Sequence, residues 1–161
     1  MTDPAKPDAT RSSLSKRRLK TWIRLLGVTR RAENHLREFL RVNHDTTLPR
    51  FDVMAALWRR RDGMTMTELS RALLVSNGNA TAVVDRLEKD GLARRTPSVS
   101  DRRTIHVALT DEGLRQFEGL AADHEREVDA LFAGLSDADL ESLSDILRRA
   151  LEKRETERDS G

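Results

Sequence analysis

The fold of this chain is decided between residues 65 and 109, which read TMTELSRALLVSNGNATAVVDRLEKDGLARRTPSVSDRRTIHVAL. Thr65 and Glu68 have the spacing of a capping box, in which a hydroxyl and a carboxylate satisfy free N–H groups at a helix start. Ser76 has the side chain of a second N-cap, and Gly91 suits a left-handed helix stop. The pattern predicts a helix packed through Leu69, Leu73 and Leu74, a tight turn, and a second helix over about 77–90.

The second helix has two chemically different faces. Four apolar side chains, spaced three and four residues apart, are expected to face the core: Ala80, Val83, Val84 and Leu87. The opposite face carries polar side chains, gathered towards the N-terminal end: Asn77, Asn79, Thr81, Asp85 and Arg86. This end reaches the base edges when a helix-turn-helix docks in the major groove of DNA.

A basic β-hairpin is expected after the second helix, with strands over 92–96 and 104–109 and a turn over 97–103. In the second strand, Ile105, Val107 and Leu109 are expected to point inward. The hairpin carries four cations: Arg94, Arg95, Arg102 and Arg103. Together the two helices and the hairpin offer an α-helix that fits the major groove and a positively charged hairpin that can contact phosphates or the minor groove. The sequence therefore predicts sequence-specific binding to duplex DNA.

Helical patterns flank this region on both sides. A long helix is expected over 15–42, roughly seven turns or about 40 Å, and Pro49 suits the first turn of the next helix. Further helices are expected after Thr110 and after Ser136. We expect a mainly α fold with a small β-wing, divided into a disordered arm (1–13), an N-terminal dimerisation helix and loop (14–48), a winged helix-turn-helix lobe that binds DNA (49–109), C-terminal dimerisation helices (110–155) and a tail (156–161).

The flanking helices carry apolar seams that the short middle region is too small to cover. Pairing with a second copy of the chain would bury them, so we expect a two-fold dimer. The residues expected at its interface are Leu19, Ile23, Leu114, Phe117, Leu140, Leu143, Leu147 and Leu151. The alternative is that the seams pack within one chain, because helix pairing inside a bundle gives similar patterns.

Composition excludes several classes of function. The chain has no cysteine, which rules out disulfides and thiolate chemistry, and its four histidines are scattered without metal-ligand spacing. No nucleophile elbow, phosphate loop or paired acid and base is present, so we expect neither an enzyme nor a cofactor. No long apolar run predicts a membrane span or a secretory signal, and we expect a cytoplasmic protein. The net charge is only +2, but eight Lys or Arg residues and no acid lie between Arg11 and Arg31.

Four segments of the chain resemble the MarR family of winged-helix transcriptional regulators. They are LPRFDV (48–53), LVSNGNAT (74–81), VDRLEKDGL (84–92) and the stretch from SDRR (100–103) to Leu109 and Thr110. The resemblance covers residues 16–151 and is most specific over 85–110. It implies a dimer, usually a repressor, that releases DNA when a small, often aromatic and anionic, molecule binds between the dimerisation helices and the DNA-binding lobe.

The resemblance also implies roles for single residues. Asp101 and Arg103 match a wing motif in which the carboxylate orients an arginine that enters the minor groove, and Arg102 is a second candidate for that arginine. Arg86 would contact phosphate, and Arg94 adds charge to the wing. Four side chains would read or brace against bases: Ser76, Asn77, Asn79 and Thr81. Asn suits bidentate pairing with adenine.

The segments 48–53 and 76–79 also look like members that control aromatic acid or hydroxycinnamate catabolism, including some that respond to aryl-CoA thioesters. The residues expected around an aromatic effector are Trp22, Phe51, Met54 and Trp58, although large apolar residues at helical spacing are more often core. The basic run 11–31 is available either to phosphates of such an effector or to those of DNA.

Two other functions compete with a DNA-binding regulator. A winged helix can also be an interaction module that binds protein or RNA, but the arginines at both ends of the hairpin turn and the small polar residues of the second helix favour duplex DNA. An enzyme ranks third, because no catalytic constellation is visible in the sequence.

Overall fold

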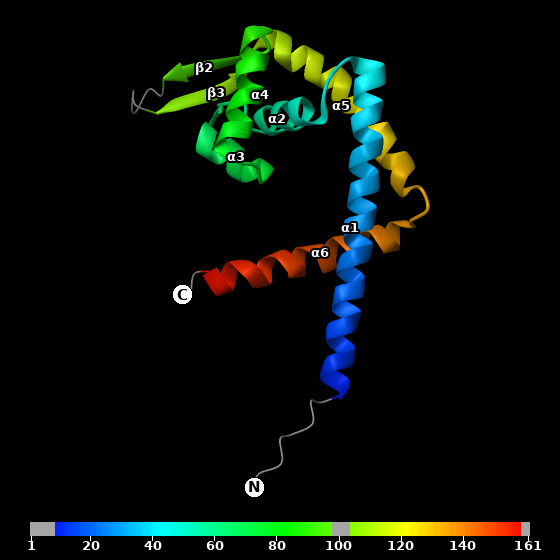
Figure 1. Ribbon diagram of the computed structural model, residues 1–161. Helices are drawn as coiled ribbons and strands as arrows, with labels where there is room; N and C mark the ends of the chain where they lie inside the picture. Colours follow the sequence, from blue (N-terminus) through cyan, green and yellow to red (C-terminus); the bar gives the residue numbers. More distant parts are fainter. Residues whose placement is uncertain (1–8, 98–103, 159–161) are drawn as a thin grey trace. The chain divides into compact units, whose positions relative to one another are not determined.

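The computed structural model describes residues 9–97 and 104–158 as a mainly helical chain with one small antiparallel sheet (Figure 1). This confirms the expected fold class. The chain divides after Glu125 into two compact units, and the division falls inside a helix. In the described part of the chain, no helix is long and apolar enough to cross a membrane.

Helix α1 (Ala9–His44) is longer than expected. It begins before residue 15, so residues 9–13, which were assigned to a disordered arm, are helical. Its 36 residues correspond to ten turns, about 54 Å rather than about 40 Å. The helix ends where Asp45 adopts a left-handed conformation (φ 46°) and the Thr46 N–H donates to the Leu40 carbonyl at 3.2 Å.

Helix α2 (Leu48–Arg59) begins as its sequence predicts, with Thr47 as N-cap and Pro49 in the first turn. The Thr47 hydroxyl accepts from the Arg50 N–H at 3.4 Å. Half of its twelve residues are buried, and Met54 and Leu57 are almost fully enclosed. α2 therefore forms the centre of the core of the first unit.

The sheet contains one strand that the sequence analysis missed. The short strand β1 (Met64–Thr65) pairs with β3 (Ile105–Leu109), which also pairs with β2 (Ala93–Pro97), in the order β1-β3-β2. Gly63 makes the entry to β1 possible, because it has a φ of 90° and a Cβ there would lie 2.9 Å from the Val107 carbonyl oxygen. Ile105 was expected inward but is 48% exposed, because it lies at the end of the hairpin away from the core.

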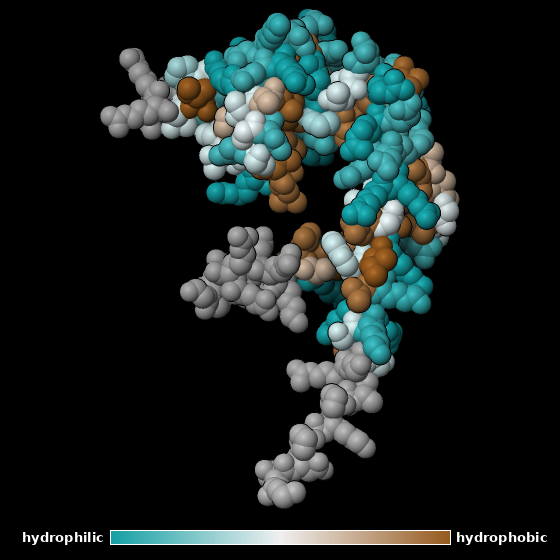
Figure 2. Space-filling view, viewed as in Figure 1, coloured by the Kyte–Doolittle hydropathy of each residue, from teal (hydrophilic) through white to brown (hydrophobic). Residues whose placement is uncertain are grey.

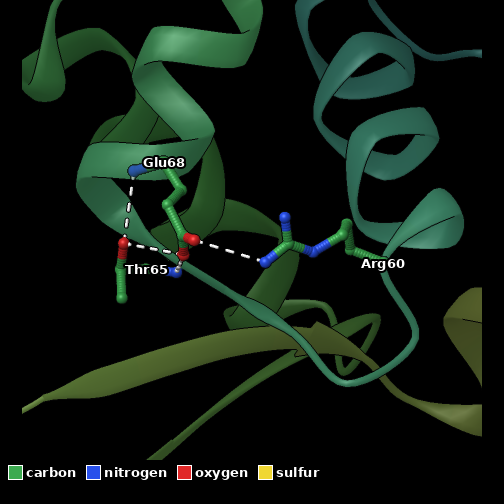
Figure 3. A network of polar contacts seen from close by, with 3 residues as sticks. All are labelled: Arg60, Thr65 and Glu68. Atoms are coloured by element: carbon green, nitrogen blue, oxygen red, sulfur yellow. Dashed lines mark hydrogen bonds and ion pairs between the residues drawn. The ribbon is translucent and has the colours of Figure 1, made fainter.

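Helix α3 (Met66–Leu73) confirms the predicted capping box. The Thr65 hydroxyl accepts from the Glu68 N–H at 3.2 Å, the Glu68 carboxylate accepts from the Thr65 N–H at 2.8 Å, and Arg60 donates to the same carboxylate (Figure 3). These hydrogen bonds, first of all the one from the Thr65 backbone, lower the pKa of Glu68. Leu74 was expected in the core but is 92% exposed, because it caps α3 in a left-handed conformation that turns its side chain outward.

The remaining helices are α4 (Asn77–Lys89), α5 (Asp111–Phe132) and α6 (Asp137–Arg158). Ala80, Val84 and Leu87 of α4 are buried as predicted. The start of α5 packs closely on the turn between α4 and β2, since a Cβ at Gly113 would lie 2.0 Å from the Leu92 carbonyl oxygen. The hairpin, α4 and α5 are therefore fixed relative to one another within the first unit.

Candidate nucleic-acid interface

The N-terminal half of α4 presents an exposed polar surface. Asn77, Gly78 and Asn79 are exposed, and Thr81 is half-buried. Ser76 caps the helix, because its hydroxyl accepts from the Asn79 N–H at 3.2 Å. Small polar side chains and a glycine keep this end of the helix slim enough to approach base edges.

Asn77 is held by a neighbour that the sequence analysis did not consider. Its Oδ1 accepts a short hydrogen bond from the Ser70 hydroxyl of α3. A bidentate contact with adenine needs both this acceptor and the amide N–H of the same side chain. In the arrangement seen here the amide N–H groups of Asn77 remain available to a base, and its contact with DNA stays a prediction.

Arg95 of β2 clamps the hairpin to α4. Its guanidinium lies 2.6 Å from Asp85 Oδ1 and 2.5 Å from Glu88 Oε2, and its backbone N–H donates to Glu88 at 3.2 Å. Burial alone would lower the pKa of Arg95, but the hydrogen bonds and charges of the two carboxylates raise it. Arg95 is thus engaged in positioning the wing, although its sequence context suggested a free cation.

Arg94 is the described wing cation that faces solvent. It is exposed, and among the described residues it forms no ion pair. It alternates with the engaged Arg95 along β2, as successive strand residues do. The other expected wing residues, Asp101, Arg102 and Arg103, lie outside the described residues.

The four residues expected around an aromatic effector are not equivalent in the structure. Phe51 and Met54 are buried in the core, whereas Trp58 is 37% and Trp22 is 56% exposed. Phe51 stacks on His124 with ring centroids 4.1 Å apart, and Trp58 lies 5.8 Å from Phe117. Phe51 and Trp58 therefore belong to an aromatic cluster with Phe117 and His124. This favours a role for these two residues in packing over a role as contacts of an effector.

One residue of the expected dimer interface, Phe117, lies in this cluster instead. Phe117 is only 4% exposed, because it packs between Phe51 and Trp58 of the same chain. The other seven side chains are less enclosed. Leu114 and Leu143 are half-buried, and five are exposed: Leu19, Ile23, Leu140, Leu147 and Leu151.

Figure 2 shows a visible surface that is largely hydrophilic, interrupted by groups of hydrophobic residues. The exposed hydrophobic residues of α1 are Leu14, Leu19, Trp22, Ile23, Leu25, Val28 and Val42. In the second unit, no described side chain from residue 126 to residue 152 is buried. Neither group of apolar residues is covered within the part of the chain that the structure describes.

The chain is similar to proteins of one known family. Residues 46–105 match the model of the MarR family. The regulator MhqR of Bacillus subtilis is 26% identical over 84% of this chain and 92% of its own length.

Two solved structures extend the likeness to nearly the whole chain. A MarR family transcriptional regulator from Silicibacter pomeroyi is 34% identical, covers 92% of this chain and 99% of its own, and has a TM-score of 0.70. Sco3205, a MarR family transcriptional regulator from Streptomyces coelicolor solved in complex with DNA, is 25% identical over 94% of this chain and 92% of its own, with a TM-score of 0.75. These relatives are named as transcriptional regulators, which agrees with the expectation that the chain is not an enzyme. This chain therefore belongs to the MarR family of transcriptional regulators.

Proposed function

We propose that this regulator is a repressor that binds a palindromic operator as a homodimer and is released by a small aromatic effector, an aromatic carboxylate or its CoA thioester. The observation that carries the DNA-binding part is the exposed polar end of α4 beside a hairpin clamped to the same helix by Arg95. A fixed distance between helix and wing lets one lobe engage a major groove and the adjacent backbone or minor groove at once.

The polar residues of α4 and the wing have proposed roles at the DNA interface. Asn79 and Thr81 contact base edges, while Asn77 donates to them and keeps its acceptor on Ser70. Arg86 contacts a phosphate, because it lies further along α4, where that helix leaves the groove. In the wing, Arg94 approaches the backbone, and Asp101 orients Arg103 or Arg102 towards the minor groove.

The uncovered apolar residues support the homodimer. Exposed leucines in α1 and in residues 126–152 would be buried by a second copy of the same surface, which is the arrangement of a two-fold interface. Two-fold symmetry presents two α4 helices to the same side of a duplex. The operator is then expected to be an inverted repeat with half-sites about one helical turn apart, ~34 Å.

Selection of duplexes from a randomised library by the purified protein tests this function. We expect enrichment of an inverted repeat, and a steep fall in affinity for it as salt rises. Arg103→Ala should weaken binding and flatten the salt dependence, because fewer counterions are released. Recovery of unrelated sequences with equal, weak affinity would contradict the proposed function.

Asn77→Ala and Asn79→Ala separate the two roles proposed for α4. Loss of Asn79 should reduce discrimination at one base position by about 1 to 3 kcal/mol. Loss of Asn77 should have a smaller effect on discrimination, because it removes a donor that is not part of a bidentate pair. Equal effects of both variants at one base position would show that Asn77 releases Ser70 when DNA binds.

A further inference from the structure

The N-terminal half of α1 carries positive charge along one side. At about 100° per residue, five of its cations fall within an arc of about 100° around the helix axis. We call these five residues the cationic stripe: Lys16, Arg17, Lys20, Arg24 and Arg31. The exposed apolar side chains of the same stretch lie outside that arc: Leu14, Leu19, Trp22, Ile23, Leu25 and Val28. The stripe is therefore separate from the apolar side of α1 that the proposed homodimer covers.

The cations of the stripe lack acidic partners in the described part of the chain. All five side chains are exposed, and within residues 9–97 and 104–158 none of them takes part in an ion pair. Other exposed arginines are paired within one helical turn, as Arg41 is with Glu38. Like charges four residues apart destabilise a helix, and Lys20 has such neighbours in Lys16 and Arg24. An anionic partner would remove this cost.

A second copy of the chain offers few acids for the stripe. Residues 126–152 carry the other apolar surface proposed for the homodimer. Four of their seven acids already have a partner: Glu127, Asp139, Asp145 and Glu152. Three acids are left for five cations: Asp129, Asp137 and Glu141. The stripe therefore suits an anion with a higher density of charge.

Duplex DNA has that density of charge. From Lys16 to Arg31 the helix rises about 22 Å, and the same length of duplex carries about thirteen phosphates on its two strands. Gly27 lies in the stripe between Arg24 and Arg31 with open space around it, so this part of the surface has room for a close approach. An anionic membrane would also require the apolar side of α1, which the homodimer covers.

The stripe lies away from the end of α1 that packs on the rest of the first unit. Leu36 and Leu40 are buried, whereas no described residue from 13 to 35 is. Along the helix axis, Arg31 lies about 8 Å from Leu36 and Lys16 lies about 30 Å from it. The stripe is therefore outside the surface that α4 and the wing present to the operator.

We propose that the cationic stripe binds the phosphate backbone of a second DNA duplex, without sequence preference, while α4 and the wing hold the operator. A dimer then bridges two segments of DNA. This rests on the proposed function, because the homodimer covers the apolar side of α1 and the operator occupies α4. Only charge carries the contact, so the second duplex should dissociate as salt rises, with a log–log slope of about 0.9 for each phosphate contact.

Capture of a labelled duplex by protein already bound to an immobilised operator tests the stripe. The full chain is loaded on the duplex selected from the randomised library, excess protein is washed away, and a labelled duplex without the inverted repeat is added. We expect the labelled duplex to be retained. The triple variant Lys20→Gln, Arg24→Gln, Arg31→Gln should bind the labelled duplex at least about tenfold more weakly. Its operator affinity should stay within about twofold, because charges more than about 10 Å away are screened.

Two further variants sharpen this test. Gly27→Arg adds a sixth cation to the stripe and should increase retention of the labelled duplex. A control triple variant loses the same charge from exposed positions outside the stripe and should retain the duplex as the unchanged chain does: Arg59→Gln, Arg115→Gln, Arg149→Gln. Circular dichroism melting verifies folding, and the stripe variant should melt no lower than the unchanged chain, because it removes repulsion within α1.

Three results would overturn the proposal. The first is operator binding with no retention of the labelled duplex, or with equal retention by the stripe variant. The second is a stripe variant that sediments as a monomer, which would assign the cations to acids of the second copy. The third is binding of the operator complex to phosphatidylglycerol vesicles but not to the labelled duplex, which would assign them to a membrane surface.

Failure of the repressor is a separate outcome. If selection from the randomised library yields no inverted repeat, the proposed function is contradicted. The stripe is then tested on total binding to an unselected duplex, for which the stripe variant should have a log–log salt slope smaller by about 0.9 for each of its three lost cations. Equal slopes would overturn the stripe as well.

Discussion

Several leucines are buried in the first unit, but most of those in residues 126–152 are exposed. In the first unit, Leu40, Leu69 and Leu87 are completely buried, with 0% exposure. In residues 126–152, four leucines are 38% to 40% exposed and a fifth is 70% exposed: Leu131, Leu135, Leu140, Leu147 and Leu151. Helical periodicity thus predicts an apolar face but does not say what covers it. The first unit completes a core of its own, whereas we propose that a second copy of the chain covers the other leucines.

Truncating a leucine in each region should give the largest contrast. Leu87→Ala removes a fully buried side chain and should destabilise the first unit by about 2 to 5 kcal/mol, at any protein concentration. Leu147→Ala should instead raise the dimer dissociation constant about tenfold. Thermal melts at two protein concentrations distinguish the two effects, and a concentration-independent loss in Leu147→Ala would place that leucine in an intrachain core.

A glycine pair in α5 tests how tightly the first unit is packed. Gly113→Ala should destabilise the protein by about 1 to 3 kcal/mol, because the new Cβ would lie 2.0 Å from the Leu92 carbonyl oxygen. Gly119 in the same helix has open space around it, so Gly119→Ala should stabilise the helix by up to about 1 kcal/mol. Chemical denaturation measures both, and equal effects would contradict the close packing of α5 on Leu92.

Arg95→Ala should reduce operator affinity more than it reduces stability. Partial exposure of the ion pairs with Asp85 and Glu88 limits the loss of stability to about 1 kcal/mol. On DNA, the wing loses its attachment and two carboxylates are left unpaired beside phosphates. The triple variant Asp85→Asn, Glu88→Gln, Arg95→Ala should recover part of the affinity, because it removes those charges. No recovery would mean that the attachment alone matters.

The smallest expected effect is a pH dependence from His124, which stacks on Phe51. Burial lowers its pKa from 6.5, so the folded state holds the neutral imidazole while the unfolded state takes up a proton. Stability should therefore be complete above pH 6.5 and fall as the pH drops through 6.5 towards the folded-state pKa. His124→Phe keeps a ring on Phe51 and should remove this part of the slope in denaturation curves recorded from pH 5 to pH 8.

Local chemistry made much of the fold predictable. The capping box at Thr65 and Glu68, the N-cap at Ser76 and the apolar face of α4 depend on residues close in sequence, and the structure has all three. Strand β1 could not be predicted from the sequence, because two residues carry no periodicity and the strand exists only through its pairing with β3. The exposure of Leu74 could not be predicted, because a leucine in a left-handed helix cap is rare.

The site was less predictable because it depends on contacts between distant residues. Arg95 meets acids seven and ten positions away, which only the turn of the chain at Gly91 brings together. Asp85 and Glu88, three residues apart on one helix face, were the available signal for a cation partner. Phe117 fits a heptad seam equally well whether it faces a second chain or Phe51. The pocket lined by Arg37, Arg50 and Arg86 brings together side chains from three helices and has no sequence signature.

Analytical ultracentrifugation of the chain, alone and with the duplex selected from the randomised library, tests the central claim most directly. We predict that the free protein sediments as a dimer and that one duplex carrying the inverted repeat binds two chains. A species with a single chain at every protein concentration, which binds all duplexes equally weakly, would contradict the account.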